Sequence, residues 1–272
     1  MMNLFFRKTG SGKPLIILHG LYGSSDNWHS IGRQLAATHT VYLLDQRNHG
    51  KSPHDPEHNY KVMSSDLYAF MQQQTIEKAI ILGHSMGGKT AMAFGLAHPE
   101  KVTGMIVVDI SPLSYDSNNQ SSAGGYHMQI LNAIGNIAED TLTSREEADK
   151  MLAKDITSPV IRQFLLKNLK RSGDGKFRWA LNIQALAANM PAIFAGIIHE
   201  QTTDPRSIPD FPLLFIKGER SPYIDTRDEV AIQHYFPKAQ IVTIPKAGHW
   251  LHAEQPKAFL EAINNFLSSA NL

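Results

Sequence analysis

The chain of 272 residues contains no cysteine. This absence excludes disulfide bridges, catalysis by a cysteine thiolate, and zinc or iron–sulfur sites held by cysteine. The chain also has no large excess of charge of either sign, because its 26 lysines and arginines nearly balance its 25 aspartates and glutamates and leave a net charge of +1. We therefore expect no nucleic-acid partner.

Long apolar runs are missing as well. No stretch approaches the roughly 20 residues needed to cross a bilayer, so we expect no membrane span. The N-terminal segment has only the short run Leu4–Phe6 before Arg7 and Lys8, which fits neither a signal peptide nor a transit peptide. We therefore expect a cytoplasmic protein. With 42% hydrophobic and 19% charged residues, the chain can build a large core.

The most informative stretch covers residues 79–92. A strand-like run, 79–82, leads into Gly83–Gly87, which reads Gly-His-Ser-Met-Gly, and a helical segment rich in alanine and methionine follows. Gly-x-Ser-x-Gly between a strand and a helix is typical of a nucleophile elbow, a sharp turn that presents the serine hydroxyl. The glycines let neighbouring backbone pass close by, and the helix start directs N–H groups at a developing anion. The pattern predicts Ser85 as a nucleophile.

A second glycine-rich turn follows the first strong strand-like run. Residues 15–18 are continuously apolar, as in a buried parallel strand, and the turn His19–Ser25 contains two glycines. In hydrolases with a nucleophile elbow, such a turn supplies one backbone N–H of the oxyanion hole, and the residue after the nucleophile supplies the other. We predict Leu21 N–H and Met86 N–H as these donors. The simpler alternative is that the glycines only form a turn.

Two other strand ends carry ionisable residues. The apolar run 105–108 ends in Asp109, and the last strand-like run, 240–244, is followed by His249 in a Gly-His turn. In α/β sheets functional groups gather where the strands end. A serine nucleophile needs a base for its proton and a carboxylate to orient that base. His249 suits the role of base, whereas Asp109 is either the acid or a cap of its turn.

Three histidines, His49, His54 and His58, lie close together in sequence. Pro53 and Pro56 prevent a regular helix that would place their imidazoles on one face, and no carboxylate–histidine pattern accompanies them. We expect no metal site and no cofactor.

The pattern changes between residues 113 and 209. Strand-like runs vanish there, and apolar residues follow helical spacing, as at Ile161, Phe164, Leu165 and Leu169. Outside this segment strands and helices alternate, which predicts an α/β fold with a mostly parallel sheet flanked by helices. We expect an α/β core of residues 1–112 and 210–272 and an inserted helical cap, 113–209, whose polar stretch 114–125 is typical of a mobile loop.

The expected cap also carries a basic stretch, from Arg162 to Arg178, in which only Asp174 is acidic. The simpler interpretation is a solvated helix face. The alternative is a site for a phosphorylated substrate tail such as that of coenzyme A, with Lys170 and Arg171 as its contacts. Apolar residues that belong either to an acyl pocket or to the core are Met128, Ile130, Phe164, Trp179 and Phe194.

Nearly the whole chain resembles the α/β-hydrolases. Four segments resemble the YbfF-type bacterial esterases and their eukaryotic relatives, the mitochondrial α/β-hydrolase-domain acyl hydrolases: His19-Gly20, Asp45–Ser52, Gly83–Lys89 and Val108–Pro112. Gly248–Pro256 resembles the C-terminal signature of the wider fold. The resemblance implies a serine esterase whose catalytic residues follow the chain order serine, aspartate, histidine.

The chain departs from the wider fold at the usual place of the acid. Most relatives carry an aspartate three residues after the glycine that ends the penultimate strand, but here Gly218 is followed at that spacing by Ser221. A hydroxyl cannot supply the charge that an imidazolium needs. We therefore assign the acid to Asp109, as the resemblance also implies, and expect Ser221 to bind near Asp109 or His249. Asp225 and Glu219 are the alternatives.

Together these observations predict a serine carboxylesterase or acyl hydrolase that cleaves small to medium acyl esters or acyl-CoA thioesters through an acyl-enzyme. Ser85, His249, Asp109 and Ser221 form the expected catalytic set, while Lys170, Arg171 and Trp179 are candidate substrate contacts. A carbon–carbon bond hydrolase or a lyase-like synthase could use the same triad. A non-catalytic ligand-binding protein of this fold is the alternative from another class. We expect a monomer or a homodimer.

Overall fold

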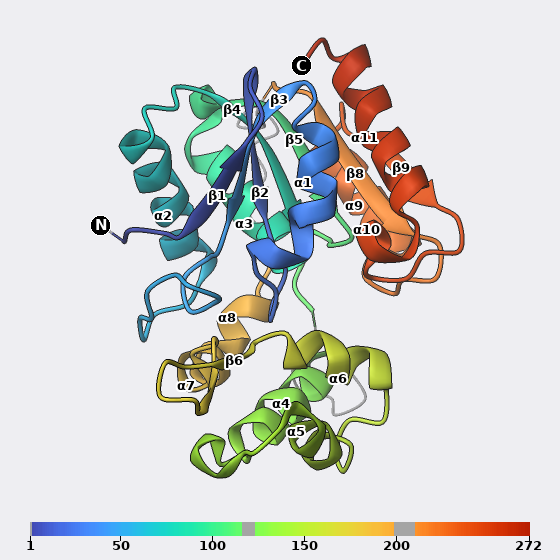
Figure 1. The fold of residues 1–272 in the computed structure, drawn as a ribbon. Helices are drawn as coiled ribbons and strands as arrows, with labels where there is room; N and C mark the ends of the chain where they lie inside the picture. The colour runs from blue at the N-terminus through green and yellow to red at the C-terminus, as the bar shows by residue number, and fades with distance from the viewer. Residues whose placement is uncertain (1, 116–122, 199–209) are drawn as a thin grey trace.

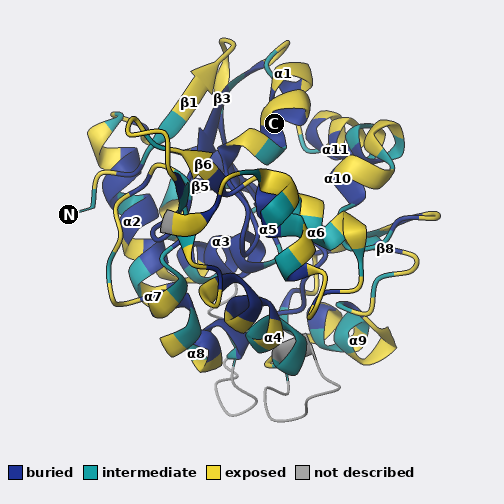
Figure 2. Cartoon of the chain, turned by 60° about the horizontal axis from the view of Figure 1, so that its bottom comes forward, coloured by how far each residue is buried: buried dark blue, intermediate teal, exposed yellow. Residues whose placement is uncertain are grey.

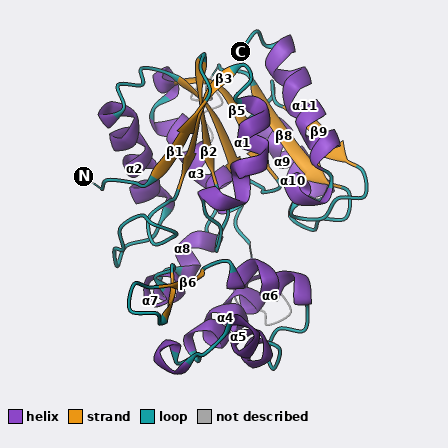
Figure 3. Ribbon diagram, viewed as in Figure 1, coloured by secondary structure: helices purple, strands orange, loops and turns teal. Residues whose placement is uncertain are grey.

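A computed structural model describes residues 2–115, 123–198 and 210–272 of the chain. Its centre is a seven-stranded sheet in the order β1-β3-β2-β4-β5-β8-β9 (Figures 1 and 3). Strand β1 runs antiparallel to β3, and every other neighbouring pair is parallel. The strands of this sheet are β1 (Phe6–Thr9), β2 (Lys13–Leu18), β3 (His39–Leu44), β4 (Ala79–His84), β5 (Val102–Val108), β8 (Leu213–Gly218) and β9 (Gln240–Ile244).

The mostly parallel sheet predicted from the sequence is confirmed. The expected strand-like runs 15–18, 79–82, 105–108 and 240–244 lie in β2, β4, β5 and β9. The first three are continuously apolar, because a strand covered on both faces needs apolar side chains at consecutive positions. Every residue of β4, for example, is buried. Strand β1 was not predicted, since it lies at the sheet edge and its last three residues are exposed.

Helices cover both faces of the sheet (Figure 1). Alternate residues of β2 pack against different helices. Leu15 and Ile17 lie in one apolar cluster with α1 (His29–Leu35) and α11 (Pro256–Ser269). Ile16 and Leu18 lie in another with α2 (Tyr60–Gln73), α3 (Met86–Ala97) and α9 (Thr226–Tyr235). Figure 2 shows the central strands as buried, and the edge strand β1 and the outward helix faces as largely exposed. The helices of the core are η1 (Ser25–Trp28), α1 (His29–Leu35), α2 (Tyr60–Gln73), α3 (Met86–Ala97), η2 (Pro99–Lys101), α9 (Thr226–Tyr235), α10 (Leu251–Glu254) and α11 (Pro256–Ser269).

A separate group of helices follows β5 and precedes β8. These helices form the cap, which lies beyond the end of the sheet (Figure 1, below the sheet) and has its own apolar cluster. A short antiparallel hairpin, β6–β7, belongs to it and was not predicted from the sequence. The elements of the cap are α4 (Ala123–Gly135), η3 (Glu139–Thr141), α5 (Arg145–Leu152), α6 (Pro159–Leu166), β6 (Leu169–Arg171), β7 (Phe177–Trp179), α7 (Ile183–Ala188) and α8 (Met190–Phe194).

The cap is attached to the core through buried polar contacts. Lys89 of α3 donates from Nζ to the carbonyl oxygens of Leu113 (2.8 Å) and Ala195 (2.7 Å), which lie on the two chain segments that lead into and out of the cap. Gly50 N–H donates to the Ala180 carbonyl at 2.8 Å. These bonds fix the cap over the carboxyl ends of the parallel strands, where α/β sheets form their sites.

Most of the expected loop 114–125 and the expected cap boundary at residue 209 lie outside the described residues. The end of the expected loop, residues 123–125, is instead the first turn of α4. In the ranges that the structure does describe, none of the helices combines the length and the apolar character needed to span a bilayer.

Candidate active site

Ser85 lies between β4 and α3 in a backbone conformation that residues with a side chain rarely adopt, with φ 52° and ψ −120°. The turn depends on Gly83 and Gly87. A Cβ at Gly83 would lie 2.1 Å from the Gly87 carbonyl oxygen, and a Cβ at Gly87 would lie 2.3 Å from the carbonyl oxygen of Leu18. Only glycine fits at either position, so the local sequence forms the elbow and places Ser85 at the wall of a cavity.

Two backbone N–H groups near Ser85 are available as donors. Met86 is the first residue of α3, where N–H groups have no intrahelical partner. Leu21 lies in the turn after β2 and lines the same cavity as Ser85. Within the part of the chain that the structure describes, neither N–H donates to a backbone carbonyl. That these two N–H groups bind an oxyanion stays a prediction.

The turn that carries Leu21 is held by a buried histidine. Tyr22 has a φ of 61° and donates its N–H to His49 Nε2 at 3.2 Å, while His49 Nδ1–H donates to the Arg47 carbonyl at 2.9 Å. Burial lowers the pKa of His49 well below its ordinary value, so the ring stays neutral and Nε2 remains an acceptor. Sequence reasoning considered His49 only as a metal ligand and missed this role, because the contact joins two loops.

Asp109 lies at the end of β5 with a φ of 52° and has no exposed surface. Its Oδ2 accepts from His249 Nδ1 at 2.7 Å and from the Ser221 hydroxyl, and its Oδ1 accepts from Gly218 N–H at 3.0 Å. These three donors hold the carboxylate in one orientation. The structure thus brings Asp109, His249 and Ser221 together.

The two alternative acids lie elsewhere. Asp225 is exposed at the start of α9, where its side chain accepts from Arg227 N–H at 2.7 Å and forms an ion pair with the Arg227 guanidinium. Glu219 is exposed and accepts from Lys246 N–H at 2.8 Å. Neither carboxylate has a contact with His249 among the described residues.

His249 lies in the turn between β9 and α10, and the carboxylate of Glu254 fixes that turn. Glu254 accepts from Gly248 N–H at 2.7 Å and from Trp250 N–H at 3.1 Å. The carbonyl oxygen of His249 accepts from His84 Nε2 at 2.9 Å. Burial, and then the neighbouring His249, lower the pKa of His84 well below its ordinary value, so His84 is a neutral donor that braces the turn.

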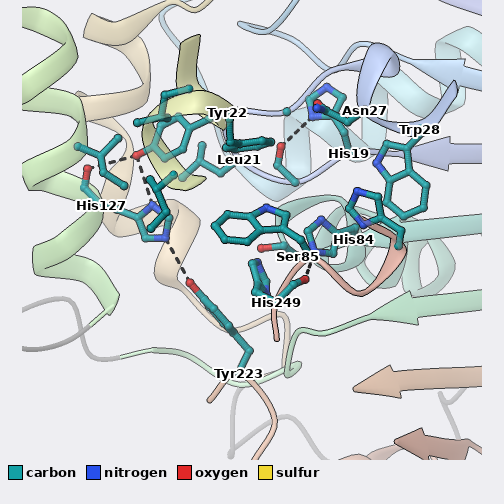
Figure 4. A pocket seen from close by; sticks show the side chains of 18 of the residues that line it. His19, Leu21, Tyr22, Asn27, Trp28, His84, Ser85, His127, Tyr223 and His249 are labelled. Carbon is teal, nitrogen blue, oxygen red and sulfur yellow. Dashed lines mark hydrogen bonds between the residues drawn. The ribbon is translucent and has the colours of Figure 1, made fainter. Parts of the chain in front are cut away.

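Ser85 and His249 line a mostly apolar cavity of about 210 Å³ between the core and the cap (Figure 4). Core residues of the cavity come from the turn after β2, η1, the elbow, the loop after β8, the turn after β9 and α10. The cap contributes Tyr126, His127, Ile130, Ile161, Phe164 and Leu165. Of the apolar residues that the sequence left undecided, Ile130 and Phe164 therefore lie at the cavity.

The three candidate substrate contacts do not line this cavity. Trp179 is buried in the apolar cluster of the cap. Lys170 is exposed and lies 3.3 Å from the Asp26 carboxylate, and the Arg171 guanidinium lies over the ring of Phe177. The acidic partner of Lys170 lies 144 residues away in sequence, which a local count of charges cannot show.

Three polar residues of the cavity were missed by sequence reasoning. His127 of α4 contacts the hydroxyls of both Tyr22 and Tyr223, and the Tyr223 ring stacks on His249 (Figure 4). These contacts depend on how the chain packs in three dimensions, and no local sequence motif indicates them. Within the residues described, no group of three or more histidines, aspartates and glutamates is arranged to hold a metal ion.

Comparison with known proteins identifies the family. The sequence pattern described as "alpha/beta hydrolase fold" matches residues 13–256. Esterase YbfF of Escherichia coli (strain K12) is 35% identical over 262 residues, which cover 95% of this chain and 94% of that protein. The sn-1-specific diacylglycerol lipase ABHD11 of Mus musculus is 37% identical over 256 residues, 93% of this chain and 80% of that protein.

Among solved structures, one named Marine microorganism esterase has a TM-score of 0.92 and 47% sequence identity, and the match covers 98% of this chain and 100% of that one. These findings confirm the resemblance inferred from the sequence motifs. The chain therefore belongs to the α/β-hydrolase fold family, within which it is a hydrolase of the esterase and lipase type.

Proposed function

We propose that this protein hydrolyses carboxylic esters with short to medium acyl chains through an acyl-enzyme on Ser85. The observation that carries the proposal is the 2.7 Å contact between Asp109 Oδ2 and His249 Nδ1 beside the strained serine turn. A carboxylate can only accept here, so Nδ1 carries the hydrogen and Nε2 is left free to take a proton.

The proposed reaction has two halves. Ser85 Oγ attacks the ester carbonyl carbon while His249 Nε2 takes the hydroxyl proton, and the oxyanion accepts hydrogen bonds from Leu21 N–H and Met86 N–H. The imidazolium then protonates the leaving alkoxide, which departs as the alcohol. In the second half His249 takes a proton from water, the hydroxide attacks the acyl-enzyme, and the acid leaves as Ser85 regains its proton.

Ser221 supports the acid in this scheme. Its hydroxyl donates to the same oxygen of Asp109 that binds His249. The bond adds no charge of its own, so the negative charge that stabilises the imidazolium comes from Asp109. We assign Ser221 the role of holding the carboxylate in place.

The proposed division of labour follows the two parts of the chain. Residues 1–112 and 210–272 carry the reacting groups, and the cap, 113–209, supplies apolar side chains against which an acyl chain packs. A cavity of about 210 Å³ lies below the ~300–1,000 Å³ typical of sites for drug-sized ligands, which favours short acyl chains. Because Lys170 and Arg171 do not line the cavity, we place simple esters ahead of coenzyme A thioesters.

The test is a substrate series with matched variants. p-Nitrophenyl acetate, butyrate, octanoate and laurate define the chain-length preference. The name of the relative from Mus musculus suggests a diacylglycerol, assayed for cleavage of its sn-1 ester, as a natural substrate to include. Ser85→Ala should lower kcat by on the order of 10⁶ with the best ester. Near-normal hydrolysis by Ser85→Ala would exclude the proposed mechanism.

Coenzyme A thioesters of the same chain lengths form the second arm of this test. We expect a lower kcat/KM for the thioester than for the matched ester, and no selective loss in a Lys170→Gln/Arg171→Gln variant. A thioester preference that disappears in this variant would replace the ester assignment with a thioesterase.

A further inference from the structure

His127 occupies a central place between the cap and the catalytic groups. It belongs to α4 of the cap, and its ring lies between two tyrosine hydroxyls of the core (Figure 4). Nδ1 lies 3.3 Å from Tyr22 Oη, and Nε2 lies 3.3 Å from Tyr223 Oη. Tyr22 Oη also donates to the backbone carbonyl of His127 at 3.2 Å.

The direction of each hydrogen bond follows from this arrangement. The His127 carbonyl can only accept, so the Tyr22 hydroxyl points its hydrogen there and must accept from Nδ1–H. Burial, and then the neighbouring His249, lower the pKa of His127 to about 4, so the ring is neutral near pH 7 and Nε2 carries no hydrogen. Nε2 therefore accepts from the Tyr223 hydroxyl.

One arm of this network leads to the base. The ring of Tyr223 stacks on the imidazole of His249 with centroids 4.1 Å apart and an angle of 26° between the planes. Burial, and then Asp109, raise the pKa of Tyr223 to about 12, so its hydroxyl remains a donor. Because His127 holds that hydroxyl, it fixes the plane against which His249 rests. An aromatic face also stabilises the imidazolium that forms during the reaction.

The other arm leads to the oxyanion turn. Tyr22 directly follows the proposed donor Leu21 and is held at its side chain by His127, at its N–H by His49, and at its carbonyl by Asn168 Nδ2 of the cap at 2.8 Å. A residue with a φ of 61° needs such contacts to stay in place.

We propose that His127 is a positioning residue that joins the two halves of the catalytic machinery, the base through Tyr223 and the oxyanion turn through Tyr22. The proposal rests on the proposed esterase function. On this view the cap both shapes the acyl pocket and sets the geometry of the reacting groups.

The test compares His127→Phe in two backgrounds. In the otherwise unchanged enzyme, His127→Phe should lower kcat for p-nitrophenyl butyrate by about tenfold and change KM by less than about threefold. In a background that carries Tyr22→Phe and Tyr223→Phe, the two hydroxyls that the His127 ring contacts are absent. There His127→Phe should lower kcat by less than about twofold. His127→Gln, which keeps a donor and an acceptor, should recover part of kcat. An equal loss of kcat in both backgrounds would overturn the proposal.

A small fluorophosphonate provides a readout that does not depend on how an acyl chain fits. Its rate of reaction with the nucleophile depends on the base and on the oxyanion donors, so the rate should fall with His127→Phe in parallel with kcat. If His127 only contacts the acyl group, KM will rise and the fluorophosphonate rate will stay at the value of the unchanged enzyme. That result would contradict a positioning role.

Matched controls come from a second stacked pair of the same residue types. The rings of Tyr68 and His98 stack 4.4 Å apart at an angle of 28° and do not line the cavity of Ser85. Tyr68→Phe and His98→Phe should leave kcat, KM and the fluorophosphonate rate within about twofold of the unchanged enzyme. The midpoint of thermal unfolding, measured for every variant, shows that each one is folded.

Tyr223→Phe tests the contact with the base separately, in case His127→Phe is unstable. Because this change keeps the ring and the stack, it retains the fold. We expect a fall in kcat, and an unchanged kcat would refute the link from His127 through Tyr223 to His249.

Failure of this proposal is distinguishable from failure of the proposed function. If the enzyme shows no turnover of esters that depends on Ser85, the proposed function is wrong. If turnover depends on Ser85 and His127→Phe matches the unchanged enzyme, only the role of His127 is wrong.

Discussion

Replacing Asp109 with asparagine is the sharpest test of how the catalytic set is assembled. Asparagine has the same shape but offers one acceptor oxygen and one NH₂ donor. If its oxygen stays on Gly218 N–H, the NH₂ group faces His249 Nδ1, which must then lose its hydrogen and become an acceptor. The neutral imidazole would carry its hydrogen on Nε2 and could not take the proton of Ser85. We expect kcat to fall by about 10⁴, equivalent to about 5.5 kcal/mol of transition-state stabilisation.

The opposite orientation of the amide also costs free energy. The NH₂ group would then meet Gly218 N–H, and one buried donor would lose its partner, which lowers the free energy of unfolding by about 1–3 kcal/mol. Steady-state hydrolysis of p-nitrophenyl acetate gives kcat, and urea unfolding shows how much of the protein is folded. The loss of activity should therefore far exceed the loss of folded protein.

Asp225→Asn is the matched control. Asp225 caps α9 by accepting from Arg227 N–H and Asp228 N–H, and asparagine caps a helix about as well. We expect kcat within about twofold of the unchanged enzyme. A folded Asp109→Asn that keeps more than about a tenth of kcat, or an inactive Asp225→Asn, would refute the assignment of the acid.

Three further predictions concern the support of the site. Ser221→Ala removes a donor from Asp109 and should lower kcat about tenfold without loss of fold, whereas an unchanged kcat would show that the hydroxyl is dispensable. Gly87→Ala should prevent accumulation of folded protein, because its Cβ would lie 2.3 Å from a carbonyl oxygen. Gly173→Ala, whose Cβ would have no atom within 4 Å, should give the yield and unfolding curve of the unchanged protein in the same assays. Burial lowers the pKa of Lys89 from 10.5 to about 7, so the unfolded chain binds the extra proton between these values and stability should rise with pH across that window. Relative to Lys89→Met, the free energy of unfolding should increase by about 1.4 kcal/mol per pH unit there, and parallel pH curves for the two proteins would contradict this.

The parts of the fold that could be predicted from the sequence are those with a local signal. Buried parallel strands such as β4 are continuous apolar runs, and the glycines around Ser85 mark a turn that no other residue allows. Strand β1 escaped prediction because an edge strand with exposed side chains leaves no such run. The hairpin β6–β7 is only three residues deep on each side, which is too short for a periodic pattern.

The candidate site divides in the same way. Ser85, Asp109 and His249 each follow a strand at the same edge of the sheet, so their meeting could be expected from the order of the elements. The contacts of His127 and His49 join loops and a helix that are distant in sequence, and nothing in the chain nearby indicates them. Lys170 appeared unpaired in sequence for the same reason, because its partner Asp26 lies in the core.

Covalent modification of Ser85 is the most direct test of its role as the nucleophile. Incubation with a fluorophosphonate, followed by intact mass measurement and peptide mapping, should show one adduct on the peptide that contains Ser85, with loss of ester hydrolysis in proportion. Ser85→Ala should show neither adduct nor turnover. Undiminished hydrolysis without modification of Ser85 would contradict the central claim.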